Sequence, residues 1–149
     1  MPPLDDQPVE MILNRLRNRD RQFQFWLYEL RNSDPTFGQA SILRPDDDGE
    51  WQAAVYLLTG SPRVWSVLGP EILSERSVAP VVRELEDRAR YFSSSELALL
   101  TWAAHLWNIY ESEVQFPYAF DESHLRRWVD ACLLRSRVPP EDQSRGGGA

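Results

Sequence analysis

Hydrophobic side chains recur with helical spacing from the start of the chain. Over residues 9–30 they follow the i, i+4, i+7 rhythm of an amphipathic helix, and Asp20 takes one position of the apolar stripe. The stripe consists of Val9, Leu13, Leu16, Phe23, Leu27 and Leu30. Pro8 suits a first helical turn, and Pro35 disfavours the α conformation in the residue before it. The pattern predicts a helix from about residue 8 to residue 31 with this stripe facing the core.

The middle of the chain predicts two further helices and a loop. Residues 32–50 hold Pro35, Gly38, Pro45 and a run of acidic residues, which indicates a loop of the length that is either functional or mobile. Residues 50–59 are apolar at most positions and are followed by Gly60 and Pro62, a typical helix stop. A short helix is then predicted over 63–68, ending at Gly69 and Pro70.

The second half predicts three more helices. An amphipathic pattern begins at Ser77 and continues to Phe92. Ser93 and Glu96 have the spacing of a capping box for the next helix, about 94–110, which is apolar on nearly every side. Asp121 is placed to cap a final helix that ends before two prolines at 139–140. We therefore predict an all-α fold, a single compact bundle of five to six helices around a central helix at about 94–110.

Composition agrees with one globular domain. The chain has 149 residues, of which 42% are hydrophobic and 26% charged, values too apolar for a disordered chain. We predict a flexible lead-in over 1–7, one helical domain over 8–138 and a flexible tail over 139–149. The acidic, proline-rich start does not resemble a signal peptide, and the longest strongly apolar window, 97–107, is too short to span a bilayer. These features favour a cytoplasmic protein without a membrane anchor.

Charge and cysteine content narrow the function classes. Sixteen arginines, no lysine and 23 acidic residues give a net charge of −7, which disfavours general binding to nucleic acid. Cys132 is the only cysteine, which excludes an internal disulfide and a cysteine-rich zinc site. We expect no metal and no cofactor, because the chain lacks the H-E-x-x-H spacing and a glycine-rich phosphate loop.

A run of helix-core patterns carries a family resemblance. Residues 53–59 read A-A-V-Y-L-L-T, residues 93–108 read S-x-x-E-x-x-L-L-x-x-A-x-x-L-W-N, and the last helix ends in A-x-L-L-R. Over about residues 51–137 this order resembles a group of small uncharacterised all-helical proteins of phages and mobile elements. The resemblance implies a phage-related accessory protein and carries over no catalytic residue.

A polar stripe on the 94–110 helix is the first candidate site. Thr101, His105 and Asn108 lie at i, i+4 and i+7 on an otherwise apolar helix. His105 could act as a proton carrier or ligand that Asn108 orients. The plainer interpretation is a solvent-facing or hydrogen-bonded strip, because the sequence supplies no nucleophile or second base beside it.

Arginines and tryptophans form the second candidate site. Arg15, Arg17, Arg19 and Arg21 are the one basic concentration, and several arginines of the first helix share a face with Tyr28. An exposed aromatic beside arginine is typical of interface centres. The candidate partner-binding residues are Arg17, Arg21, Trp26, Tyr28, Arg31 and Trp65. The alternatives are pairing with the chain's own carboxylates, a solvated face, or nucleic acid.

Two weaker candidates have structural explanations. Asp46, Asp47, Asp48 and Glu50 could hold a divalent cation, but a solvated acidic loop at the start of a helix explains them better. His124 could be a metal ligand together with Glu122 and His105, but a surface position near a predicted helix start explains it better.

Two main functions and one weaker one remain open from the sequence alone. The first is a non-enzymatic protein–protein interaction module of accessory, inhibitor or immunity type. The alternative is a ligand-binding or enzymatic bundle that uses the polar stripe at His105. A third and weaker hypothesis is a nucleic-acid mimic, which the arginine content disfavours. The sequence leaves the partner and the oligomeric state undetermined.

Overall fold

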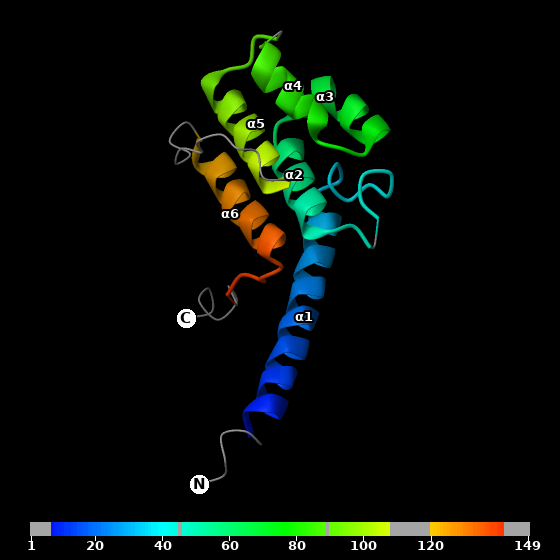
Figure 1. Ribbon diagram of the computed structural model, residues 1–149, viewed down its shortest axis with the longest axis vertical. Helices are drawn as coiled ribbons and strands as arrows, with labels where there is room; N and C mark the ends of the chain where they lie inside the picture. Colours follow the sequence, from blue (N-terminus) through cyan, green and yellow to red (C-terminus); the bar gives the residue numbers. More distant parts are fainter. Residues whose placement is uncertain (1–6, 45, 89, 108–119, 142–149) are drawn as a thin grey trace.

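The computed structural model describes residues 7–44, 46–88, 90–107 and 120–141, and this part of the chain folds into six α-helices (Figure 1). They are α1 (Gln7–Ser33), α2 (Gly49–Thr59), α3 (Pro62–Glu75), α4 (Ala79–Asp87), α5 (Ser94–Trp107) and α6 (Glu122–Ser136). The all-α prediction is confirmed. Residues 1–6, most of the predicted tail and Asn108 lie outside the described part.

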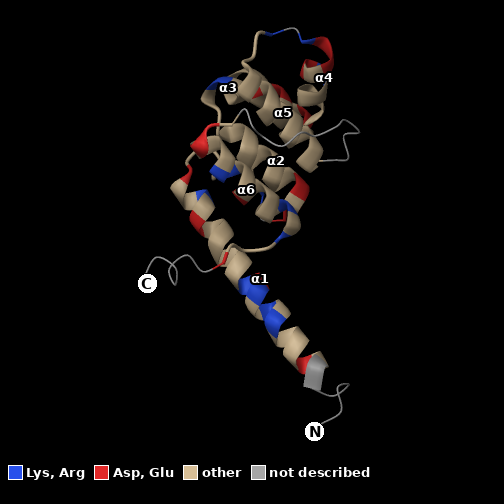
Figure 2. Cartoon of the chain, turned by 90° about the vertical axis from the view of Figure 1, so that its left-hand side faces the viewer, with Lys and Arg blue, Asp and Glu red and all other residues tan. Residues whose placement is uncertain are grey.

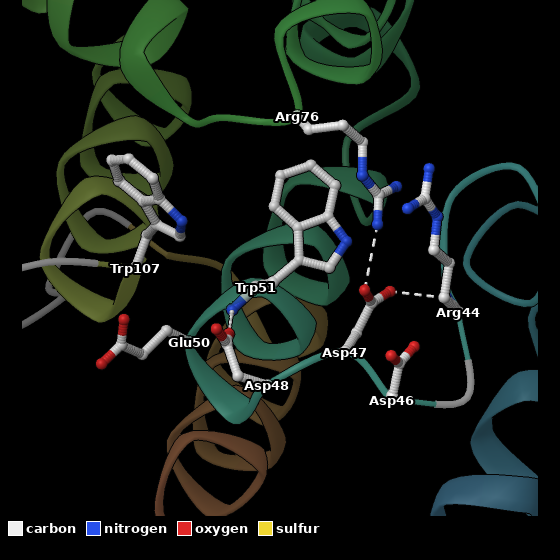
Figure 3. A pocket seen from close by; sticks show the side chains of 8 residues that line it. All are labelled: Arg44, Asp46, Asp47, Asp48, Glu50, Trp51, Arg76 and Trp107. Atoms are coloured by element: carbon white, nitrogen blue, oxygen red, sulfur yellow. Dashed lines mark hydrogen bonds and ion pairs between the residues drawn. The ribbon is translucent and has the colours of Figure 1, made fainter.

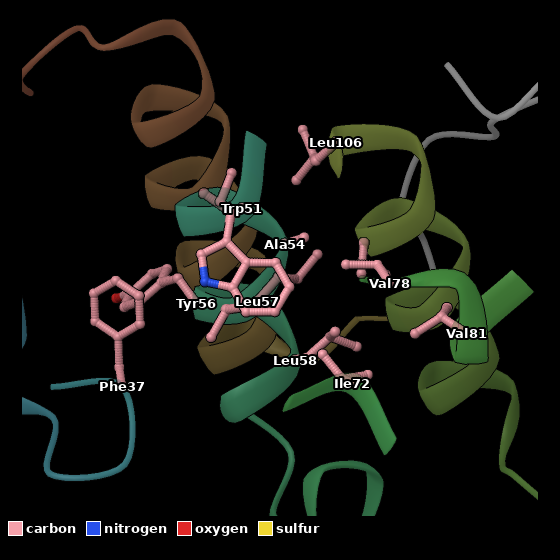
Figure 4. Close-up of a cluster of buried hydrophobic side chains, with 14 of the residues drawn as sticks. Phe37, Trp51, Ala54, Tyr56, Leu57, Leu58, Ile72, Val78, Val81 and Leu106 are labelled. Atoms are coloured by element: carbon pink, nitrogen blue, oxygen red, sulfur yellow. The ribbon is translucent and has the colours of Figure 1, made fainter. Parts of the chain in front are cut away.

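The helix at the centre of the bundle is α2. It packs against α3, α5 and α6, and all of its residues except Glu50 are buried (Figure 4). The prediction placed the 94–110 helix at the centre, but α5 covers one side of α2 and leaves His105 exposed. The sequence correctly predicts that α5 is apolar, but the prediction that it lies at the centre of the bundle is wrong. Two tryptophans, Trp102 and Trp107, are only half-buried on α5, which explains how an apolar helix can lie at the side.

Small residues bring α2 and α6 together. A Cβ atom added to Gly49 would lie 3.0 Å from the carbonyl oxygen of Leu134, so α2 begins directly against the α6 backbone. Ala131 is fully buried in the same helix pair. The two helices are separated by more than sixty residues of sequence, so this contact joins the two halves of the chain.

Side-chain caps fix where several helices begin, as the sequence predicted for Ser93 and Asp121. Asp48 accepts a hydrogen bond from the backbone N–H of Trp51 at 2.8 Å, and Asp121 accepts one from His124 at 2.8 Å. Ser93 and Glu96 form a reciprocal capping box, with N···O distances of 3.2 and 2.7 Å. Each cap satisfies an N–H group that the helix itself leaves unpaired.

The predicted stop at Gly69 and Pro70 is wrong, because α3 runs through both residues to Glu75. Proline within a helix removes one backbone hydrogen bond. Leu68 and Ile72 lie on either side of it and are fully buried, so packing of both turns against the core offsets that loss. Pro70 itself is exposed.

The long loop before α2 is part of the core. Phe37, Ile42 and Leu43 are buried to 2% exposure or less, although the sequence indicated only a polar loop. The indole N–H of Trp51 and the guanidinium of Arg76 both donate to the carbonyl oxygen of Ile42, each at 3.0 Å. The described part of this loop is therefore fastened to α2 and to the end of α3.

Arg127 of α6 joins three segments of the bundle. It pairs with Asp34 at 2.6 Å, donates to the Thr59 hydroxyl at 2.8 Å and to the Tyr56 carbonyl oxygen, and stacks on the Tyr56 ring at 4.0 Å. A Cβ atom on Gly60 would lie 2.2 Å from its side chain. Glycine at position 60 leaves room for this arginine.

Candidate functional site

The first half of α1 projects away from the bundle (Figures 1 and 2). All side chains described from residue 9 to residue 22 are exposed, and burial begins at Phe23. We call residues 7–22 the projecting half of α1. Seven of the nine exposed large hydrophobic residues of the described chain belong to α1. Exposed hydrophobic side chains of the described chain are therefore concentrated on α1.

The predicted inward face of α1 is correct only near its end. Phe23 and Leu27 are buried, and Leu30 is half-buried. Leu13 and Leu16 were expected to face the core but are 44% and 52% exposed. The apolar spacing does belong to a helix, as predicted. In the described chain, however, no other helix lies beside the first four turns of α1, so the apolar stripe is uncovered there.

The arginines of the projecting half lack carboxylate partners among the described residues. By contrast, seven arginines elsewhere form ion pairs with carboxylates of the chain. The structure shows no such pair for Arg15, Arg17, Arg19 or Arg21, which favours a solvated face over intramolecular pairing. With two acidic residues, the segment 9–22 carries a net charge of +2 in a chain of −7 (Figure 2).

Four of the predicted partner-binding residues share one face of α1. Arg17 and Arg21 are exposed, Tyr28 is 64% exposed, and Arg31 is half-buried at the end of the helix. Helical spacing places them on one flank of the apolar stripe. We call this set the arginine face.

The two tryptophans proposed for this site do not join the arginine face. Trp26 is half-buried, and its ring lies 6.0 Å from that of Phe23 in an edge-on arrangement. Trp65 belongs to α3 and packs against the core. The helix α3 lies at the end of the bundle away from the projecting half of α1 (Figure 1). Both side chains are engaged in packing, and the arrangement separates Trp65 from the other candidates.

The polar stripe on α5 has local explanations where it is described. The Thr101 hydroxyl donates to the carbonyl oxygen of Leu97, one turn earlier, at 2.8 Å. His105 is exposed, and its ring lies edge-on to Trp102 at 5.6 Å. Asn108 lies outside the described residues. The catalytic hypothesis for His105 stays a prediction that this geometry does not strengthen.

A cavity of about 490 Å³ lies beside the acidic loop (Figure 3). Its lining residues are Arg44, Asp46, Asp47, Asp48, Glu50, Trp51, Arg76 and Trp107. Most of its carboxylates already have partners: Asp47 pairs with Arg76 at 3.0 Å, Asp48 caps α2, and Glu50 pairs with Arg135 at 3.1 Å. The acidic run thus serves mainly to hold the loop and the start of α2, which agrees with the predicted placement of negative charge at the start of a helix but not with a fully solvated loop.

The strongest perturbation of a titratable group lies inside the bundle. Burial raises the pKa of Tyr56 to about 12, and the nearby Arg127 opposes that shift. Burial also raises the pKa of Asp130, and its interactions with Arg127 and Tyr56 oppose that shift. The cysteine thiol of Cys132 likewise has a pKa raised by burial, which makes it a poor nucleophile.

Comparisons with known proteins identify no family for this chain. No protein-family model, curated protein or solved structure matches the chain. Within the described residues, no helix combines the length and apolarity needed to cross a membrane. The same residues contain no cluster of three or more histidine, cysteine or acidic side chains arranged to hold a metal ion.

Proposed function

We propose that the protein is a non-enzymatic interaction module that binds an acidic partner protein through the arginine face of α1. The observation that carries the proposal is the charge of the projecting half. Its four arginines are exposed and without carboxylate partners in the described chain, whereas seven arginines elsewhere form ion pairs. An acidic partner would supply those carboxylates.

The arginine face has suitable chemistry for a protein partner. Guanidinium groups bind carboxylates through two parallel hydrogen bonds, and Tyr28 adds a rigid aromatic surface between them. Nucleic acid is a weaker candidate, because the net charge of −7 would repel a phosphate backbone. The resemblance to phage and mobile-element proteins favours an accessory, inhibitor or immunity-type role.

The test is capture of partners from the source cell with matched charge variants. Arg21→Glu should weaken binding of the genuine partner by about 1–3 kcal/mol, because a like charge replaces an attractive one at the interface. Folding stability should change little, since exposed charges contribute little to it. The double variant Arg21→Glu and Arg31→Glu should release the partner.

Arg126→Glu on α6 is the matched control, because its guanidinium is also highly exposed, at 80%. A partner lost with the α1 variants and kept with this control supports the proposal. Equal recovery with all variants would refute the assignment of the arginine face. Capture that disappears on nuclease treatment would assign nucleic acid instead.

A further inference from the structure

The apolar stripe of α1 forms a second face, beside the arginine face, and its spacing is that of a coiled coil. Its positions alternate between steps of four and three residues, from Val9 through Leu13, Leu16 and Asp20 to Phe23 and Leu27. Such a 4–3 repeat lets a second helix pack along the first with interlocking side chains. Within the bundle, Phe23 and Leu27 are already covered; in the projecting half, the stripe is open.

The open stretch has a defined length and a defined end. It spans residues 7–22, which is about 24 Å of helix at 1.5 Å per residue. Beyond it, the bundle occupies the stripe, and the guanidinium of Arg137 lies 4.6 Å from the ring of Phe23. A helix packed on the open stripe must therefore stop where the bundle begins.

Charge changes sign along the same stretch. Glu10 lies on the flank of the stripe near the start of α1, and Arg17 lies on the same flank seven residues later. Two copies running in opposite directions would place each acidic position beside the basic position of the other. The helix is thus complementary to itself when reversed.

We propose that two copies of this chain pair through antiparallel packing of the projecting halves of α1. With the two-fold axis between residues 14 and 15, Leu13 of each copy packs against Leu16 of the other. Glu10 of each copy then faces Arg17 of the other, and residues 7–22 overlap completely. Asp20 lies opposite Val9, at the two ends of the overlap, where its carboxylate stays close to water.

A parallel pair fits the molecule poorly. Asp20 of both copies would meet on the shared stripe, where like charges repel and lose water. The second helix would also run into the bundle at Phe23, because the stripe is already occupied from that residue onward. In the antiparallel pair the two bundles lie at opposite ends of the contact and do not compete for the same space.

The proposal is separate from the acidic-partner function. Arg21 and Tyr28 lie away from the stripe and stay accessible in the pair, so the same helix can serve both contacts. Leu16→Ser tests the pair without changing the arginine face, and Arg21→Glu tests the acidic partner without changing the stripe, whereas Arg17 contributes to both contacts. Either proposal can fail while the other holds.

The first experiment measures the mass of the full-length chain across a concentration series by analytical ultracentrifugation. We expect a monomer–dimer equilibrium. Leu16→Ser should weaken the dimer at least about tenfold, because burial of a leucine contributes more than the free energy of a tenfold change. Met11→Ser is the matched control: Met11 is similarly exposed, at 48%, but lies on the opposite side of α1, and this variant should dimerise like the parent.

The second experiment uses charge reversal to test the direction of pairing. Glu10→Arg alone and Arg17→Glu alone should each weaken self-association, because each brings like charges together twice. A mixture of the two variants should form heterodimers more tightly than either forms homodimers, because both flanking contacts then join opposite charges. That rescue by mixing is expected only for an antiparallel pair in this register.

Several results would overturn the proposal. They are a wild-type chain that stays monomeric at every concentration, a Leu16→Ser variant that dimerises as well as the parent, or mixing without rescue. Cosedimentation of a monomeric chain with vesicles of anionic phospholipid, abolished by Leu16→Ser, would assign the stripe to a membrane surface instead. Circular dichroism should show that each variant keeps its helical fold, because every substituted position is exposed.

Discussion

Replacing Arg127 with methionine should destabilise the bundle far more than the same replacement of an exposed arginine. The side chain is only 17% exposed, and its partner Asp34 is 20% exposed. Methionine keeps much of the aliphatic length that packs beside Tyr56 but removes every hydrogen-bond donor. The substitution therefore isolates the polar contacts of the guanidinium.

The expected loss follows from the groups left behind. Asp34 loses its ion pair, and the Tyr56 carbonyl oxygen and the Thr59 hydroxyl each lose a donor. Asp34 keeps two backbone hydrogen bonds, from Thr36 and Phe37, which limits its share of the loss. At about 1 kcal/mol for each of the three groups, the free energy of unfolding should fall by about 3 kcal/mol.

Urea denaturation followed by tryptophan fluorescence measures this loss. Arg126→Met is the matched control, because Arg126 precedes Arg127 on the same helix and pairs with Glu122 at the surface. We expect that control to change the free energy of unfolding by less than about 1 kcal/mol. Equal effects of the two substitutions, or a loss below about 1 kcal/mol for Arg127→Met, would refute the reasoning.

Three further predictions concern the same core. Gly60→Ala should cost about 1–3 kcal/mol in a denaturant titration, because the new methyl group displaces Arg127, and its effect should not add fully to that of Arg127→Met. Leu100→Ala should cost about 2–5 kcal/mol, since the side chain is fully buried; a loss below about 0.5 kcal/mol would contradict that packing. Stability should fall as pH rises from about 10 to about 12, because tyrosine ionises near pH 10 in the unfolded chain while Tyr56 in the fold resists ionisation up to about 12. Tyr56→Phe should reduce that alkaline loss in urea midpoints, and an unchanged pH profile would contradict the assignment.

Local signals in the sequence predicted the start of a helix well at Ser93 and Asp121, where a side-chain cap defines it. Asp48, Ser93 and Asp121 each begin a helix by a hydrogen bond that depends on residues three positions apart. The Pro70 stop failed because burial of Leu68 and Ile72, which depends on distant segments, outweighed a local preference. Caps are local; burial is decided by the whole chain.

The sequence also predicts only part of the candidate site, because the exposure of a side chain depends on the whole chain. Helical spacing placed Arg17, Arg21 and Tyr28 on one face, and the structure leaves all three exposed. Periodicity alone could not show that Leu13 and Leu16 extend beyond the bundle, because an apolar stripe has the same pattern whether or not a partner covers it. The role of Arg127 was missed, since its three partners are far away in sequence and no motif connects them.

The enclosed position of α2 has a consequence for how the chain is made. This helix leaves the ribosome about 77 residues before the end of α6, the segment against which it packs most extensively. At roughly 5–20 residues per second, its apolar surface waits roughly 4–15 s for that cover. Nascent chains halted before α6 should therefore remain protease-sensitive and bind chaperones, whereas chains released after it should not.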